Sequence, residues 1–320
     1  MLKIDELEKC YRNKEKRSIF HTTKSKGEKK ALDGINIDLK EGQALACIGE
    51  NGAGKSTLIK CALGILSPTS GSVRLFGEDP RRNKKYCMQK VGVVFGQKTN
   101  LWIDIPVIES YKAVKQIYKV DNDTFKRNYE MVMELLELKD IIDVPARRLS
   151  LGQRMRADIG LVLLHGPELL FMDEPTLGLD INVKYTIRKF LRQLNQQEKT
   201  SIFLTSHDLD DIDEICDDAI VISKGKQIYS GKLDELKNVY ADKHIIKISG
   251  MKTGNILSLF PGVELTEKEN QSIISWDKSC YSVQDVISGV FRMYAVDDIE
   301  VREPDIDEVV SRIFTEGVSI

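Results

Sequence analysis

A glycine-rich segment constrains the fold of this chain more than any other feature. Residues 49–57 read Gly-Glu-Asn-Gly-Ala-Gly-Lys-Ser-Thr and fit the pattern G-x-x-x-x-G-K-[ST]. The apolar run 44–48 before it predicts a buried strand, and apolar residues at helical spacing follow it. A turn between a strand and a helix directs backbone N–H groups and the positive end of the helix dipole at one point. Such a point suits a polyphosphate.

The residue types within this segment support nucleotide binding. Gly52 and Gly54 lack a Cβ, so the backbone can approach a ligand closely. Lys55 can reach the β- and γ-phosphates, and the Ser56 hydroxyl can ligate Mg²⁺. We predict that ATP binds to Gly49, Asn51, Gly52, Ala53, Gly54, Lys55, Ser56 and Thr57.

Composition sets broad limits. A chain of 320 residues suggests two domains. The formal net charge of -2 does not favour nucleic acid as a partner. Six scattered cysteines without a C-x-x-C pair suggest free thiols in a reducing cytoplasm. The N-terminus lacks the apolar segment of a signal peptide, and no apolar run reaches the roughly 20 residues of a membrane span. We therefore expect any membrane role to depend on a partner.

Short apolar runs alternate with stretches of helical periodicity between residues 44 and 205. This alternation favours an α/β fold with a mainly parallel sheet covered by helices on both faces. A turn at Glu41-Gly42 is expected to join the strands on either side as a hairpin. The predicted strands are 1–11, 31–39, 44–48, 72–76, 91–95, 169–172, 201–205, 220–222 and 227–229, and the predicted helices are the one after residue 57, 121–139, 149–164 and 182–195.

The patterning changes near residue 238, where we place a domain boundary. Residues 1–238 are expected to form an ATP-binding domain, and residues 239–320 a small α/β domain. That second domain can either bind a ligand as a sensor or serve packing and dimer support. Its predicted strands are 245–248 and 273–276, and its predicted helices are 283–294 and 306–314.

Residues 12–30 are rich in Lys and Arg and poor in residues that form a core. Only Glu15 and Glu28 offset the positive charge. A segment of this kind is expected to be a solvated surface insertion. Contact with lipid headgroups or with the acidic face of a partner is the alternative.

Two adjacent carboxylates follow the apolar run 169–172. Asp173 at the end of this strand can hold the Mg²⁺ shell, while Glu174 can orient or deprotonate an attacking water. One carboxylate then serves the metal and the other the nucleophile. Together with the glycine-rich loop, the pair predicts an enzyme that hydrolyses ATP.

The segment Leu149-Ser150-Leu151-Gly152-Gln153 precedes a predicted helix, and here the sequence resembles the ATP-binding subunits of ABC transporters. Ser150, Gly152 and Gln153 match the family signature Leu-Ser-Gly-Gly-Gln, whereas Leu151 replaces a glycine. The resemblance implies that Ser150 and Gly152 contact the γ-phosphate of ATP held by a second copy. It therefore implies a head-to-tail homodimer, with an antiparallel β subdomain and a helical subdomain beside the parallel sheet.

Other positions match further motifs of the family. Gln97 resembles the glutamine that contributes to the Mg²⁺ or water site, and His207 the histidine that contacts the γ-phosphate. Asp180 resembles the aspartate of a loop that crosses the dimer interface. Tyr11 is in the place of the aromatic residue that stacks on adenine, with Phe20 as a rival.

The resemblance also implies membrane partners. Leu101 and Trp102 are predicted to be exposed on a loop that contacts another subunit, with a buried core tryptophan as the alternative. Segments 94–102 and 298–309 resemble bacterial drug and viologen exporters, which pair with separate permease chains. This predicts an exporter subunit at the cytoplasmic face of the cell membrane. The alternative is a soluble ABC-type ATPase in DNA repair or translation, although such chains usually carry two cassettes or a long coiled coil.

Overall fold

The computed structural model describes most of the chain, and its contacts divide it into two units. The first unit lies within residues 1–231 and the second begins at Lys232. The sequence placed the boundary slightly later, near residue 238. The described residues are 1–12, 28–96, 98–206, 208–238, 243–250, 260–268, 271–293 and 296–302.

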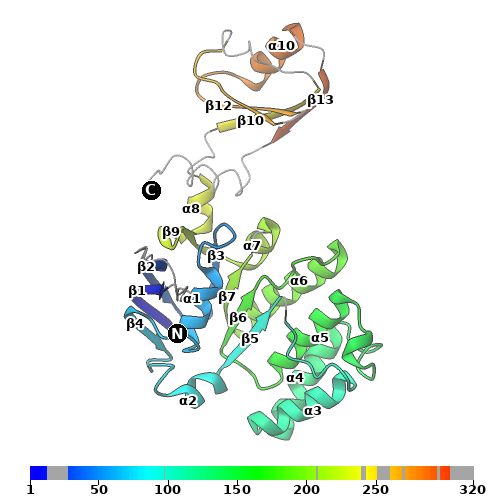
Figure 1. Cartoon of the computed structure of the whole chain (residues 1–320). Helices are drawn as coiled ribbons and strands as arrows, with labels where there is room; N and C mark the ends of the chain where they lie inside the picture. Colours follow the sequence, from blue (N-terminus) through cyan, green and yellow to red (C-terminus); the bar gives the residue numbers. More distant parts are fainter. Residues whose placement is uncertain are drawn as a thin grey trace, which may run out of the picture. The chain divides into compact units, whose positions relative to one another are not determined.

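The core of the first unit is a six-stranded sheet, shown in Figure 1. Its strand order is β5-β6-β7-β3-β8-β9, and the first five of these strands pair in parallel. The mainly parallel sheet predicted from the alternating pattern is therefore confirmed. The strands are β3 (Ala44–Ile48), β5 (Val91–Phe95), β6 (Leu169–Asp173), β7 (Ser201–Thr205), β8 (Asp218–Ser223) and β9 (Lys226–Lys232).

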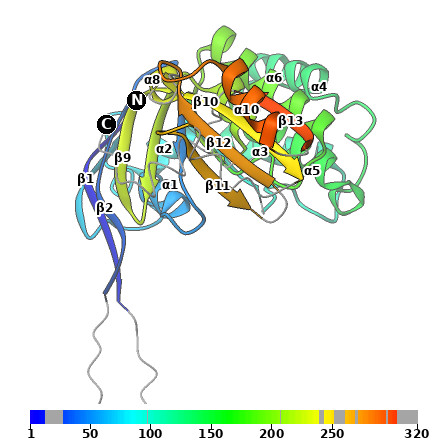
Figure 2. The same ribbon diagram turned by 90° about the horizontal axis from the view of Figure 1, so that it is seen from above.

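A second sheet of the same unit is antiparallel, in the order β2-β1-β4. Its strands are β1 (Leu2–Arg12), β2 (Glu28–Leu39) and β4 (Ser70–Leu75). The basic insertion is therefore shorter than predicted, because both its ends belong to strands and Tyr11 pairs with Lys29. Figure 2 shows β1 and β2 as a long ribbon.

The predicted hairpin across Glu41-Gly42 is wrong. β2 pairs with β1 in one sheet, whereas β3 pairs with β7 and β8 in the other. The burial patterns explain the difference. β2 alternates between buried and less buried residues, as a strand with one covered face does, whereas every residue of β3 is buried. The turn thus carries the chain from one sheet to the next.

The helices of the first unit follow from amphipathic stretches between the strands. They are α1 (Lys55–Ala62), α2 (Lys84–Gln89), α3 (Val107–Tyr118), α4 (Asn122–Leu135), α5 (Leu151–Leu163), α6 (Ile181–Glu198) and α7 (Leu209–Ile215), with a 3-10 turn at Ala146–Arg148. The sequence pattern did not predict α3, because only Val107, Ser110 and Tyr111 of that helix are buried.

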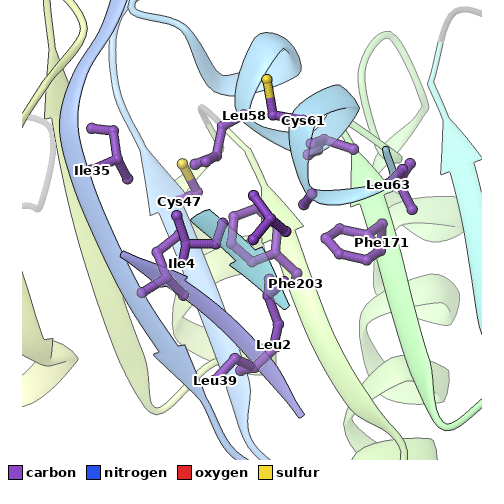
Figure 3. Packing of buried hydrophobic residues seen from close by; sticks show 14 of the residues in the cluster. Leu2, Ile4, Ile35, Leu39, Cys47, Leu58, Cys61, Leu63, Phe171 and Phe203 are labelled. Carbon is purple, nitrogen blue, oxygen red and sulfur yellow. The ribbon is translucent and has the colours of Figure 1, made fainter. Parts of the chain in front are cut away.

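The helix α1 packs between the two sheets. Leu58 and Cys61 of α1 are buried in one apolar cluster with side chains from both sheets (Figure 3). Phe171 of β6 and Phe203 of β7 contact each other in it, with ring centroids 5.5 Å apart. Burial of each large side chain stabilises the fold by about 1.5–3 kcal/mol. This packing fixes the start of α1 relative to the ends of the parallel strands.

The second unit contains a four-stranded antiparallel sheet in the order β11-β12-β10-β13. Its elements are α8 (Leu233–Asn238), β10 (Lys243–Gly250), β11 (Glu264–Lys268), β12 (Gln271–Asp277), α10 (Val283–Met293) and β13 (Val296–Arg302). Val286 and Val290 of α10 pack with Trp276 and Ile246 of the sheet, and Figure 2 shows the strands side by side. The predicted helix 306–314 lies outside the described residues.

Two predictions from composition can be compared with the structure. All six cysteines are free thiols, as predicted. Within the described part of the chain, no helix combines the length and the apolar character that a membrane span requires.

Candidate functional site

The glycine-rich loop lies between β3 and α1, at the carboxyl edge of the parallel sheet. Gly54 caps α1 with φ 117°, and a Cβ there would lie 2.6 Å from the carbonyl oxygen of Ala31. A Cβ on Gly49 would lie 2.4 Å from the carbonyl oxygen of Ile222. Both glycines are therefore required by close contact with neighbouring backbone, and their packing holds the loop in place.

Lys55 is the first residue of α1 and lines a cleft together with other residues of the glycine-rich loop. Its ammonium donates a hydrogen bond of 2.5 Å to the carbonyl oxygen of Gly49. The carboxylate of Glu174 lies 3.6 Å away, beyond hydrogen-bonding distance. The lysine side chain is only 7% exposed. Among the described residues, the ammonium has one hydrogen-bond acceptor and one nearby carboxylate, and a nearly buried cation of this kind is suited to an anionic ligand.

β7 holds the carboxylate of Asp173, the last residue of β6, and the backbone of Glu174. The hydroxyl of Thr205 donates to Asp173 Oδ1 at 2.7 Å, and the backbone N–H of Glu174 donates to the Thr205 carbonyl oxygen at 3.0 Å. Glu174 has φ 55°, a left-handed conformation that is uncommon outside glycine. Such conformations are concentrated at functional sites, where the surroundings enforce them. Both carboxylates face the same cleft.

This nucleotide cleft has a volume of about 990 Å³. It brings together most residues of the glycine-rich loop with Tyr11, Asp173 and Glu174. Gly49 and Ala53 do not line it and instead support the loop, since the Ala53 carbonyl oxygen accepts a hydrogen bond from Gly225 N–H. The predicted site residues that line the cleft are Tyr11, Asn51, Gly52, Gly54, Lys55, Ser56, Thr57, Asp173 and Glu174.

Several lysines in the cleft wall were missed by the sequence analysis. They are Lys29, Lys30, Lys60, Lys98 and Lys224. They come from β2, α1 and two loops that are distant in the sequence. A basic wall attracts a polyphosphate through its charge. No local pattern marks these residues, although Lys224 belongs to a recognisable turn with Gly225.

The donor set at the cleft fits Mg²⁺ that is bound together with a phosphate. Ser56 supplies a hydroxyl and Asp173 a carboxylate to the lining of the cleft. Mg²⁺ usually takes one or two carboxylates and completes its shell with substrate phosphates and water. Within the described residues, no group of three His, Cys, Asp or Glu side chains could hold a metal without such a ligand.

The predicted signature segment forms the start of α5. Ser150 caps this helix by accepting from Gln153 N–H at 3.2 Å, while Gln153 Oε1 accepts from Ser150 N–H at 3.0 Å. A Cβ on Gly152 would lie 2.9 Å from a methyl group of Val183, so glycine permits α5 to approach α6. Leu151, which departs from the signature, remains about half exposed.

Asp180 caps α6 by accepting a 3.0 Å hydrogen bond from Val183 N–H. Neither Asp180 nor the signature residues Ser150, Gly152 and Gln153 line the nucleotide cleft. In Figure 1, α5 and α6 lie on the other side of the six-stranded sheet from α1. These predicted ATP contacts are therefore separated from the cleft of their own chain.

The predictions for Gln97, His207 and Phe20 concern positions outside the described residues. The prediction for the loop after Gln97 is half right. Trp102 is 55% exposed, but Leu101 is buried.

Leu101 follows Asn100, whose backbone N–H donates to the buried carboxylate of Asp158 on α5 at 2.9 Å. Burial raises the pKa of Asp158 to about 6, despite the hydrogen bonds it accepts.

A smaller groove of about 220 Å³ lies beside Trp102, between β5, α3 and α5. Its wall includes the exposed side chain of Ile117 and the stacked rings of Tyr118 and His165, whose centroids are 4.0 Å apart. Burial lowers the pKa of His165 to about 4, so this ring is neutral near pH 7. The groove therefore offers a mainly apolar surface next to an exposed tryptophan.

Comparison with known proteins identifies a family and several relatives. A family described as ABC transporter matches residues 32–177. Nod factor export ATP-binding protein I of Ralstonia nicotianae is 34% identical over 219 residues, which cover 68% of this chain and 68% of that protein. Energy-coupling factor transporter ATP-binding protein EcfA of Methanosphaera stadtmanae is 35% identical over 243 residues, which cover 75% of this chain and 85% of that protein.

A solved structure shares the fold. It is the dimeric structure of the ATP-binding cassette MJ0796 in a post-hydrolysis state bound to ADP and Pi. The TM-score is 0.61 at 23% sequence identity, and the match covers 73% of this chain and 99% of the other. The ABC-type ATPase fold expected from the resemblance is confirmed.

Proposed function

Since this chain belongs to the family of ABC transporter ATP-binding subunits, we propose that two copies of it bind ATP head to tail and drive export through separate permease chains. ATP binding and hydrolysis are properties of the family. The head-to-tail arrangement, the direction of transport, the membrane partners and the role of each site residue are the parts that we propose.

The composition of the nucleotide cleft is the observation that carries the proposal. It contains the glycine-rich loop, both carboxylates and Tyr11, but neither Ser150 nor Gly152. A γ-phosphate bound at Lys55 is therefore open on one side in a single copy. The start of α5 in a second copy can close that side, because a helix N-terminus with a serine binds anions. The hydroxyl of Ser150 can still donate while its oxygen caps the helix.

Each residue of the cleft then has its own role in binding or hydrolysing ATP. Tyr11 stacks on adenine, and the N–H groups at the start of α1 hold the phosphates together with Lys55. Glu174 accepts a proton from water as the water oxygen bonds to the γ-phosphorus. The bond from that phosphorus to the bridging oxygen breaks, and ADP leaves with the electron pair.

Three further residues complete this assignment. His207 contacts the γ-phosphate and, with Gln97, aligns the attacking water. Asp173, held by Thr205, and Ser56 hold Mg²⁺ together with Gln97. The metal supplies charge stabilisation for the phosphates.

The groove beside Trp102 is the proposed contact for a permease chain. An exposed tryptophan and Ile117 border a mainly apolar hollow, and aromatic anchors of this kind are typical of interfaces. The proposal implies a peripheral protein on the cytoplasmic face of the membrane. A relative whose name specifies export, at 34% identity, supports the outward direction.

The variant Glu174→Gln tests the proposal. It should bind ATP like the wild type, lose turnover by about 10²–10⁴-fold, and accumulate as a dimer with ATP, because the γ-phosphate that joins the copies persists. Glu168→Gln is a matched control, since Glu168 lies at the other end of β6 and pairs with Lys90. Binding, turnover and dimer content can be measured by nucleotide titration, phosphate release and light scattering.

Two results would contradict the proposal. If Glu174→Gln hydrolysed ATP at the wild-type rate, Glu174 would not be the base. If ATP never produced a dimer of that variant, the head-to-tail arrangement would be wrong.

A further inference from the structure

An ionic network around one buried arginine joins α6 to α7 and to the residue just before α7. Arg188 of α6 is only 7% exposed and contacts four carboxylates. Its guanidinium lies 2.5 Å from Asp211, 2.9 Å from Asp208, 3.4 Å from Asp210 and 3.6 Å from Glu214. Burial alone would lower the pKa of Arg188, but the hydrogen bond with Asp211 and the surrounding negative charge raise it. The arginine is therefore charged, and it has four anionic partners.

Asp211 is the centre of this network. Its side chain is fully buried, and its Oδ1 accepts from Arg188. The other oxygen accepts from the hydroxyl of Ser206 at 3.0 Å and from the hydroxyl of Thr176. A single carboxylate thus binds three elements of the fold. Removing it would leave Arg188 partly unpaired and two hydroxyls without their acceptor.

The partners of Asp211 flank two proposed catalytic residues. Thr176 is two residues after Glu174, and Ser206 immediately precedes His207. The network therefore contacts the chain close to both the proposed base and the proposed γ-phosphate contact.

The other side of position 207 is held in the same way. The carboxylate of Asp208 contacts Arg188 and Lys184, which lie one turn apart on α6, and its backbone N–H donates to Ser206 Oγ at 3.0 Å. Burial opposes ionisation of Asp208, but these two cations lower its pKa. α6 is the helix that begins at Asp180, so the same network links the segment around residue 207 to the predicted dimer-contact loop.

We propose that Asp211 and Arg188 are positioning residues for ATP hydrolysis, which set the spacing between the segments that carry Glu174 and His207. The inference rests on the proposed function, because it takes the roles of Glu174 and His207 from it. Neither Asp211 nor Arg188 lines the cleft. They act on the reaction through Thr176, Ser206 and Asp208.

The structure contains a matched control for a purely structural role. Arg192 lies one turn after Arg188 on α6 and pairs with Asp217 beyond α7 at 3.0 Å. This more exposed ion pair joins α6 to the segment that follows α7, and Arg192 also donates to the carbonyl oxygen of Ile215 rather than to Thr176 or the residues beside position 207. Loss of either link weakens the contact between α6 and α7. Only loss of the contact between Arg188 and Asp211 should move the proposed catalytic groups.

The experiment compares Asp211→Ala, Asp211→Asn and Asp217→Ala in the full-length chain, below the melting temperature of each variant. Asp211→Ala should lower kcat by about a hundredfold, since displacements near 1 Å cost that much, while the Kd for ATP stays unchanged. Asp211→Asn should restore most of kcat. Its oxygen can accept from Arg188, and its amide can donate to the two hydroxyl oxygens. Asp217→Ala should retain the wild-type kcat.

Thr176→Val is the second variant, because it removes one hydroxyl while keeping the side-chain shape. It should lower kcat by about tenfold with unchanged ATP binding, even if Asp211→Ala does not fold. Wild-type kcat in Thr176→Val would overturn the inference, as would equal losses of kcat in Asp211→Ala and Asp217→Ala.

The two proposals fail in different ways. If the wild-type chain does not hydrolyse ATP, or Glu174→Gln does not stop it, the proposed function fails. If the wild type is active and sensitive to Glu174→Gln but Thr176→Val keeps full kcat, only the positioning role fails.

Discussion

Lys55 in the nucleotide cleft and Arg188 in the network between α6 and α7 are both 7% exposed, yet their surroundings differ. Arg188 contacts four carboxylates, two of them within 3 Å. Lys55 donates to one carbonyl oxygen and lies 3.6 Å from its nearest carboxylate among the described residues. Burial of a charge is costly unless it is paired and hydrogen-bonded. The Arg188 guanidinium has two carboxylates at hydrogen-bonding distance, whereas the Lys55 ammonium has only a carbonyl oxygen at that distance among the described residues.

We therefore expect the loss of Arg188 to lower the stability of the fold, and the loss of Lys55 to weaken the binding of an anionic ligand. Removing one member of a completed network leaves other charges unpaired, so it should destabilise the fold. Removing a cation with few partners should hardly affect folding but should abolish the binding of its ligand. The following variants test the two halves of this rule, and they begin with the largest expected effect.

Lys55→Ala should abolish ATP binding at ordinary concentrations. The lysine can donate to two phosphates, and hydrogen bonds to charged groups contribute about 1.5–3 kcal/mol each, so two such contacts are worth about 3–6 kcal/mol. Titration with a fluorescent ATP analogue measures the loss. Lys60→Ala, an exposed lysine of the same helix and cleft, should weaken binding far less. Wild-type affinity for ATP in Lys55→Ala would show that this buried cation does not bind the nucleotide.

Arg188→Ala should lower the free energy of unfolding by about 3–5 kcal/mol without any nucleotide, because it leaves the fully buried carboxylate of Asp211 without its cation. Urea denaturation followed by circular dichroism measures this change. Arg192→Ala breaks an exposed pair with Asp217 and should cost about 0–1 kcal/mol. Equal losses in the two variants would mean that the completed network adds nothing to the fold beyond a surface ion pair.

Asp158→Asn sharpens the comparison with a buried anion. Asp158 accepts a hydrogen bond from Asn100 N–H, and the described residues provide no ion pair for it. Its pKa is raised from 3.8 to about 6, so the folded state binds its proton more tightly than the unfolded state does. The stability that this group contributes is present below pH 3.8 and is lost as the pH rises through 6.

The Asn variant should therefore gain stability relative to the wild type between pH 4 and pH 7. The expected gain is about 3 kcal/mol, from about two pKa units at 1.36 kcal/mol each. Denaturation curves at several pH values measure it. If the difference in the free energy of unfolding between the two proteins did not change with pH across this range, burial of Asp158 would not disfavour its ionised form.

Much of the nucleotide cleft was predictable because its signals are local. The glycine-rich loop, the strand before it and the helix after it are neighbours in the chain, and so are Asp173 and Glu174. Parallel strands bring their carboxyl ends to one edge, so the two motifs were expected to meet. The fold class followed from the same periodicity.

The errors arose where one local pattern is compatible with two tertiary arrangements. The turn at Glu41-Gly42 suits a hairpin as well as a passage between sheets, and only the complete burial of β3 decides between them. Leu101 and Trp102 are adjacent in a loop, yet one is buried and the other exposed. No periodicity in a short loop reveals which side chain faces the core.

The amino-acid sequence by itself determined the phosphate-binding loop, the acidic pair and the parallel sheet, because these depend on backbone geometry between near neighbours. Only the tertiary structure decided which lysines line the cleft and that Arg188 meets Asp211 and, through it, Thr176. Along the chain, Arg188 is 23 residues from Asp211 and Thr176 is 35 residues from it. A buried charge is stabilised by whatever the fold brings within about 3 Å, and sequence distance carries no information about that.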